Sequence, residues 1–135
     1  MNISLLRESF NLVRPHADAV AQDFYATLFS TYPQVKPLFK NADPAEQRRK
    51  LMASVAAVVA AADEPEVLEP VLEAMGARHV DYGVSADMYA PVTHTMMGAL
   101  ARAAGEAWTP ELASSWLAAL EMVSARMIEA QQRAA

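Results

Sequence analysis

Apolar residues recur at intervals of three and four along almost the whole chain, and proline or glycine interrupts them at distances that suit helices. This spacing gathers apolar side chains on one face of an α-helix, whereas a half-buried strand needs strict alternation. The pattern predicts six or seven helices and no strand. They are expected at about residues 4–14, 16–31, 35–39, 44–62, 63–83, 86–104 and from 109 onward. The sequence therefore predicts an all-α fold, with residues 1–135 as one domain.

Local signals mark several of the expected helix ends. Pro15 is expected to stop the first helix, because a proline lacks the amide proton that continues the hydrogen-bond ladder. Asp43, followed by Pro44 and three residues ahead of Glu46, has the arrangement of an N-cap with a capping box. Ser85 is expected to cap the helix that follows it.

Charge and composition exclude several classes of function. The chain has 16 acidic and 11 basic residues, and its net charge of -5 repels nucleic acid. It has no cysteine, which excludes disulfides, thiolate metal sites and thiol nucleophiles. The start of the chain lacks the pattern of a signal peptide, and the apolar stretch 55–62 falls far short of the ~20 residues that span a bilayer. We expect no membrane partner and a soluble, cytoplasmic protein.

Histidine is the residue type most able to carry chemistry in this chain, because the common zinc, calcium, phosphate and serine-nucleophile motifs are missing. His79 follows Met75 by four residues and so continues an apolar helix face. It is expected to point inward, either as a satisfied core histidine or as a ligand. His16 and His94 are expected at the surface or at its boundary.

An inward histidine fits haem, since a porphyrin supplies four nitrogens and leaves one face of the iron for an imidazole and the other for a gas. The gas side needs an apolar wall with one or two hydrogen-bond donors, which Tyr25, Phe39, Gln47 and Leu51 could provide. Gln47 and Leu51 are four residues apart and share a helix face. The same spacing also fits a solvated glutamine in a first turn followed by an ordinary core leucine, and Tyr25 alone fits the edge of a core.

Several linked motifs resemble those of bacterial single-domain globins and of the globin half of flavohaemoglobins. They are FYATLF at 24–29 with YPQVKPLF at 32–39, EQRRKLM at 46–52, and MGARH at 75–79 with YGV at 82–84. The resemblance covers essentially the whole chain and implies a globin fold around one haem pocket. It further implies roles for individual residues: Phe39 packs on the porphyrin, Tyr25 and Gln47 face the gas with Leu51 beside them, His79 binds the iron, and Met75 and Val84 flank the porphyrin.

One feature of the family pattern is altered here. Tyr89 matches a tyrosine that, in flavohaemoglobins, joins a glutamate of the last helix in a network around the proximal histidine. Counting without gaps from Trp116 puts Gln131 at the place of that glutamate, with Glu129 two residues away. The change argues against an anionic push on the imidazole and against peroxidase-like or flavohaemoglobin-like reactivity.

The resemblance implies a haem b protein that binds O2 reversibly, and also NO or CO, for oxygen transport, storage or sensing. The alternative is an enzyme that converts NO to nitrate, with a separate reductase as electron donor. A third class, a haemless helical interaction module, conflicts with the intact set of His79, Phe39, Tyr25 and Gln47. The oligomeric state is left open between monomer and homodimer.

Overall fold

The computed structural model describes residues 1–134, so Ala135, the last residue of the predicted domain, lies outside the described residues. Within residues 1–134 there is no strand, and the all-α prediction is confirmed. The α-helices are α1 (Ile3–Val13), α2 (Ala17–Thr31), α3 (Pro44–Ala60), α4 (Pro65–Asp81), α5 (Tyr89–Ala104) and α6 (Pro110–Ala134). Short 3-10 helices connect them: η1 (Arg14–His16), η2 (Pro33–Phe39), η3 (Ala86–Met88) and η4 (Gly105–Ala107).

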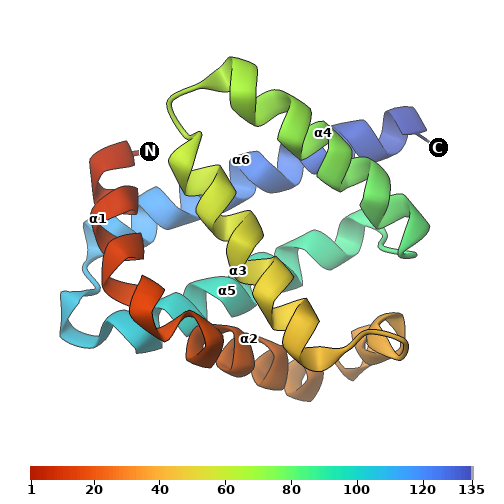
Figure 1. Cartoon of the computed structure of the whole chain (residues 1–135), viewed down its shortest axis with the longest axis horizontal. Coiled ribbons are helices and arrows are strands. Elements are labelled where there is room, and N and C mark those ends of the chain that lie inside the picture. The colour runs from red at the N-terminus through yellow and green to blue at the C-terminus, as the bar shows by residue number, and fades with distance from the viewer. Residues whose placement is uncertain (135) are drawn as a thin grey trace.

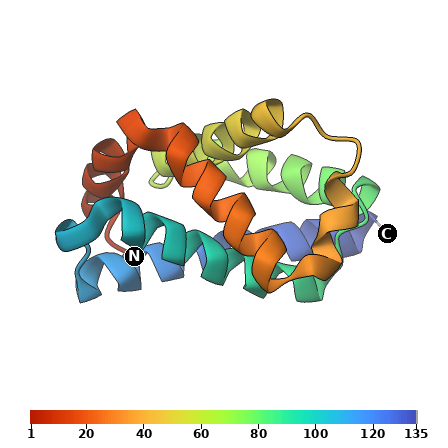
Figure 2. The ribbon, with the colours of Figure 1, turned by 90° about the horizontal axis from the view of Figure 1, so that it is seen from below.

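The larger apolar core is built by α1, α2, α3, α5 and the first half of α6. Leu6, Leu28 and Leu100 are fully buried in it, each with 1% of its surface exposed. Trp116 is buried among them, and its indole Nε1 donates a hydrogen bond to Ser9 Oγ over 2.9 Å. Seen from below in Figure 2, α3 and α4 lie on one side of the molecule and α5 and α6 on the other.

A smaller core joins α4 to α6. Leu68 and Leu72 are buried there, with Met75, Met122 and Val123 packed against them. The two helices approach so closely at Gly76 that a β-carbon on it would lie 2.5 Å from the carbonyl oxygen of Met127. Only a residue without a side chain allows this approach, which places the His79 segment firmly against α6.

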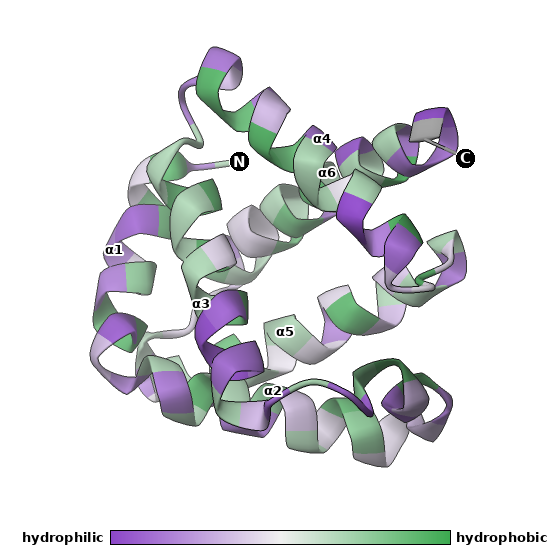
Figure 3. Ribbon diagram, turned by 45° about the vertical axis from the view of Figure 1, so that its right-hand side comes forward, coloured by the Kyte–Doolittle hydropathy of each residue, from purple (hydrophilic) through white to green (hydrophobic). Residues whose placement is uncertain are grey.

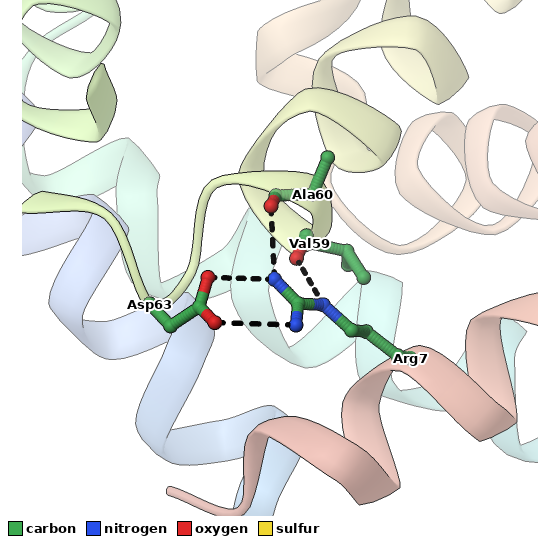
Figure 4. A network of polar contacts seen from close by, with 4 residues as sticks. All are labelled: Arg7, Val59, Ala60 and Asp63. Atoms are coloured by element: carbon green, nitrogen blue, oxygen red, sulfur yellow. Dashed lines mark hydrogen bonds and ion pairs between the residues drawn. The ribbon is translucent and has the colours of Figure 1, made fainter.

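Arg7 stabilises the connection between α3 and α4. Its guanidinium donates to the carbonyl oxygens of Val59 and Ala60, over 3.4 and 2.9 Å, and pairs with the Asp63 carboxylate at 2.8 Å (Figure 4). These carbonyls belong to the last turn of α3, where intrahelical donors run out, and Arg7 supplies donors to both. From this fixed point α3 and α4 diverge, as Figure 1 shows. The candidate residues on α3 and those on α4 therefore lie on two diverging helices, which we call the two arms of the site.

Of the predicted signals for helix ends, the Asp43 N-cap is confirmed, and the capping box, the stop at Pro15 and the Ser85 cap need correction. Asp43 accepts a hydrogen bond from the Glu46 amide as an N-cap, but the Glu46 carboxylate pairs with Arg49 instead of completing a capping box. Pro15 lies inside η1, because α1 has already ended at Val13. Ser85 caps no helix: its hydroxyl donates to the Asp87 carboxylate, and α5 begins at Tyr89, after a 3-10 turn.

Polarity changes along α3 in a way that matters for the site. Figure 3 shows a hydrophilic beginning of this helix, followed by a more apolar remainder. Gln47 and Arg48 belong to the hydrophilic part, and Val55 and Val59 are buried in the apolar part.

None of the helices found in residues 1–134 combines the length and the apolarity that a membrane span requires.

Candidate functional site

The residues expected to face the gas, which we call the distal group, come from three elements. Tyr25 lies on α2, Phe39 ends η2 and Gln47 lies in the first turn of α3. The Tyr25 ring meets the Phe39 ring edge-on, with 5.6 Å between the centroids, and Phe29 lies within 5.8 Å of both. The bend that η2 introduces after α2 is what returns Phe39 to Tyr25, and the two prolines of η2 fix that bend.

Gln47 and Tyr25 are directly linked by a hydrogen bond. The Gln47 side-chain amide donates to the Tyr25 hydroxyl oxygen over 3.1 Å. Burial raises the pKa of Tyr25, and the bond from Gln47 opposes that rise only partly, so the phenol keeps its proton. Because its oxygen accepts from Gln47, the Tyr25 proton is available to a further acceptor. Tyr25 is thus a donor oriented by Gln47.

A cavity of about 690 Å³ opens beside this pair. Tyr25, Phe39 and Gln47 line it, together with further residues of α2, η2 and the start of α3. Leu51, one turn beyond Gln47, is half-buried against the larger core and is not part of this lining. The cavity therefore contains the polar distal pair but does not extend to the predicted ligand on α4.

The proximal group centres on His79, near the end of α4. Its ring is half-buried, and Nδ1 lies 2.6 Å from the carbonyl oxygen of Met75, one turn earlier in the helix. Desolvation lowers the pKa of His79, the nearby Arg78 charge lowers it further, and the bond to Met75 only partly compensates. The imidazole is therefore neutral near pH 7, with Nδ1 as donor and the Nε2 lone pair free. Neutral imidazole with one nitrogen fixed in this way is the form that binds metals.

The donor set fits a haem better than a bare ion. One imidazole holds iron when the other ligands arrive with the metal, and a porphyrin brings four nitrogens. Apolar neighbours suited to a flat macrocycle are half-buried on both arms, namely Phe39, Leu51, Met75 and Val84. His16 and His94 are exposed, as predicted.

The segment after His79 is held by α6. Val84 donates its amide to the His79 carbonyl over 3.0 Å, and Gly83 between them has φ +82°. Gln131 of α6 donates its side-chain amide to the Val84 carbonyl and accepts a 3.0 Å hydrogen bond from the Tyr89 hydroxyl. Glu129 instead pairs with Arg126 at 3.5 Å. Of the two residues considered for this place, Gln131 is the one in the network, and it is neutral.

The sequence-predicted residues thus form two groups. Tyr25, Phe39 and Gln47 come together on the distal side, and Met75, His79, Val84 and Tyr89 on the proximal side, where the His79 and Tyr89 rings lie 6.2 Å apart. The arms approach where Leu38 of η2 lies beside Gly83, with 3.6 Å between a Leu38 methyl and the position of a Gly83 β-carbon.

The cavity walls also contain residues that sequence reasoning missed. Phe29, Lys36 and Arg48 line the cavity with Lys40 and Gln22. The only sequence signal for these residues was their spacing: Phe29 follows Tyr25 by four residues, and Lys40 follows Lys36 by four. Neither spacing alone distinguishes a cavity wall from a surface.

The globin family model matches residues 22–127, a range that includes Tyr25, Phe39, Gln47 and His79. The chain therefore belongs to the globin family. A flavohemoprotein of Bordetella parapertussis is 32% identical over 118 residues, which cover 86% of this chain and 29% of the relative. The chain thus spans less than a third of the length of this curated relative.

Solved structures agree in fold. A bacterial globin from Campylobacter jejuni superposes with a TM-score of 0.85 at 18% identity, covering 97% of this chain and 94% of its own. An engineered carbene transferase from Rhodothermus marinus superposes with a TM-score of 0.87 at 24% identity, covering 97% and 91%. At these identities the likeness establishes the globin fold and leaves the function to the site.

Proposed function

We propose that this globin holds one b-type haem through His79 and binds O2 reversibly, with NO and CO as further ligands. The observation that carries the proposal is the geometry of His79: Nδ1 lies 2.6 Å from the Met75 carbonyl oxygen, which leaves Nε2 for the iron. When bound, haem would supply an iron that can take up a diatomic gas. Phe39, Leu51, Met75 and Val84 would contact the porphyrin, and Tyr89 would support the proximal side through Gln131.

On the distal side the proposed roles of Tyr25 and Gln47 differ. Tyr25 would donate a hydrogen bond from its hydroxyl to the gas, and Gln47 would orient that hydroxyl through the 3.1 Å bond that its amide donates to the Tyr25 oxygen. A partly negative O2 ligand accepts such a bond, whereas CO is less polar. The pair therefore favours O2 over CO relative to an apolar pocket.

Residues 1–135 would act as a single globin domain in oxygen transport, storage or sensing. A cytoplasmic location and a monomeric or homodimeric state remain predictions.

A second candidate is conversion of NO to nitrate with electrons from a separate reductase. It is favoured by the Rhodothermus marinus neighbour, whose description also names it a nitric oxide dioxygenase candidate. The neutral Gln131 argues against it, since that activity gains from an anionic proximal partner. A turnover assay with NO, O2 and an added reductase decides between the two: catalytic NO consumption would favour the enzyme.

The first test replaces the proposed iron ligand. We expect His79→Ala to lose haem during purification or to hold it only with added imidazole, because the Nε2 ligand is gone. His94→Ala is the matched control, since His94 is exposed on α5. Visible spectra of both ferrous proteins give the result. A normal five-coordinate spectrum of His79→Ala without imidazole would remove His79 from the site.

The second test concerns the distal donors. A hydrogen bond to a charged acceptor contributes about 1 to 3 kcal/mol, or roughly five- to a hundredfold in a dissociation rate. We expect Tyr25→Phe to speed O2 release by such a factor and to change CO release little, with Gln47→Leu acting in the same direction but more weakly. Tyr32→Phe is the control, because Tyr32 does not line the cavity. Equal acceleration of both gases in stopped-flow measurements would mean that Tyr25 acts through packing.

A further inference from the structure

The cavity on the distal side has walls of unusual charge for this chain. Lys36, Lys40 and Arg48 line it, and none of the carboxylates in residues 1–134 does. The whole chain carries 16 acidic against 11 basic residues, so a random patch of its surface would be acidic on balance. A local excess of cations inside a concavity attracts and holds an anion.

The cations of the cavity are only partly neutralised. Arg48 donates through Nε to Asp18 over 2.8 Å, and its side chain is 24% exposed. Lys36 and Lys40 are exposed at the rim, and neither takes part in an ion pair within the described residues. Lys36 lies on η2 and Lys40 directly follows the end of η2 at Phe39, with Pro37 between them, so both lysines belong to one short, proline-restricted segment of the cavity wall.

The rest of the cavity wall is apolar and made of rings. Phe29 and Phe39 meet at 61° with 5.3 Å between centroids, and Pro33, Pro37 and Pro44 add flat, rigid faces. A volume of about 690 Å³ is within the usual range of sites for small organic ligands. Aromatic and proline faces pack well against a flat ring.

We propose that this cavity binds an aromatic carboxylate, with its ring between the phenylalanine and proline faces and its carboxylate at Lys36 and Lys40. The site rests on the proposed gas-binding function in two respects: Tyr25 and Gln47 belong both to the cavity and to the distal pair, and Phe39 lines the cavity and is also proposed to contact the porphyrin. A ligand that accepts a hydrogen bond from either residue takes a donor away from the gas. Occupation of the cavity therefore speeds O2 release and lowers the affinity for O2, and O2 in turn lowers the affinity for the aromatic acid by the same factor.

The experiment measures binding of 2-naphthoate to the haem-loaded globin by calorimetry, beside its uncharged analogue 2-naphthamide. An exposed ion pair is worth roughly twofold to fivefold in affinity. We expect Lys36→Gln and Lys40→Gln each to weaken 2-naphthoate by about this factor and to leave 2-naphthamide unchanged. Lys50→Gln is the matched control, because Lys50 is exposed on α3 outside the cavity lining. Added salt should weaken 2-naphthoate as well.

Stopped-flow O2 release with and without 2-naphthoate tests the coupling, with an expected acceleration of about threefold or more, since part of a hydrogen bond is lost. Equal affinity for the acid and the amide, or equal loss in Lys50→Gln, would overturn the site. Binding to the haem-free chain that disappears once haem is loaded would also overturn the site, because the haem would then fill the cavity. Unchanged O2 release at saturating 2-naphthoate would overturn the coupling. The ferrous and CO spectra are recorded first: if the chain takes up no haem, the gas-binding proposal fails, and calorimetry on the chain itself still tests the anion site.

Discussion

Gly76 is the position at which a single methyl group tests how α4 is held against α6. A β-carbon there would lie 2.5 Å from the Met127 carbonyl oxygen and 2.9 Å from the Ala130 β-carbon. Neither neighbour can rotate away, since one is backbone and the other is a rigid methyl group on the same helix. The substitution Gly76→Ala must therefore push α4 from α6, three residues before His79.

The expected cost follows from two opposing effects. Overpacking of a rigid contact costs about 1 to 3 kcal/mol, and alanine returns up to ~1 kcal/mol through its better helix propensity. Because backbone forms the closest contact, we expect a net loss of about 1 to 2 kcal/mol in the free energy of unfolding. In a domain of this size that lowers Tm by roughly 3 to 8 °C.

Gly98→Ala provides a matched control on α5. Its β-carbon would meet only the end of the Arg102 side chain, at 3.1 Å, which is flexible. We expect this variant to be as stable as the parent or more stable by up to ~1 kcal/mol. Urea unfolding followed by far-UV circular dichroism measures both variants. If Gly76→Ala proved as stable as Gly98→Ala, the close α4–α6 contact would be wrong.

Two further predictions concern charge. Asp23 accepts hydrogen bonds from Arg102, the shorter one over 2.7 Å, and these bonds hold the pKa of the Asp23 carboxyl below its usual value. The ionised carboxylate therefore stabilises the fold above pH ~3.9, and this stabilisation is lost as the pH falls below that value. Asp23→Asn should therefore cost under ~1 kcal/mol at pH 7 and nothing near pH 2, and urea unfolding that showed the same difference at both pH values would refute this. Gln131→Glu should replace a donor to the Val84 carbonyl by a carboxylate, which costs about 1 to 3 kcal/mol in the free energy of unfolding and lowers the reduction potential of the haem-loaded protein. The control Glu129→Gln, on the exposed side of α6, should change neither the stability nor the potential. An unchanged potential in Gln131→Glu would count against a proximal role.

The parts of the fold that could be predicted from the sequence are those set by periodicity and by strong local signals. Asp43 and Pro44 mark the start of α3, and the row of apolar residues through Leu68 and Leu72 marks the buried face of α4. Both signals depend on neighbours within a few residues. The globin fold itself was predicted from linked motifs, and the family match over residues 22–127 confirms it.

The parts that could not be predicted depend on contacts between distant residues. Ser85 has the residue type of an N-cap, but the Asp87 carboxylate competes for its hydroxyl, and no local rule decides that competition. The roles of Gln47 and Gln131 likewise depend on partners 22 and 42 residues away. Spacing predicted that Gln47 shares a helix face with Leu51 but did not indicate that Gln47 would bond to Tyr25.

The two glutamines give the site its chemical character, because each occupies a place where a charged or titrating side chain could serve. Gln47 orients the Tyr25 donor without bringing a proton that titrates near neutral pH. Gln131 fixes Tyr89 and the segment after His79 without adding negative charge near the imidazole. A neutral proximal partner donates less electron density to iron than a carboxylate would. Under the proposed function, neutral residues at both places therefore favour a site that binds and releases its ligand over one that activates it, with Tyr25 as the donor to the gas and Gln47 as its support.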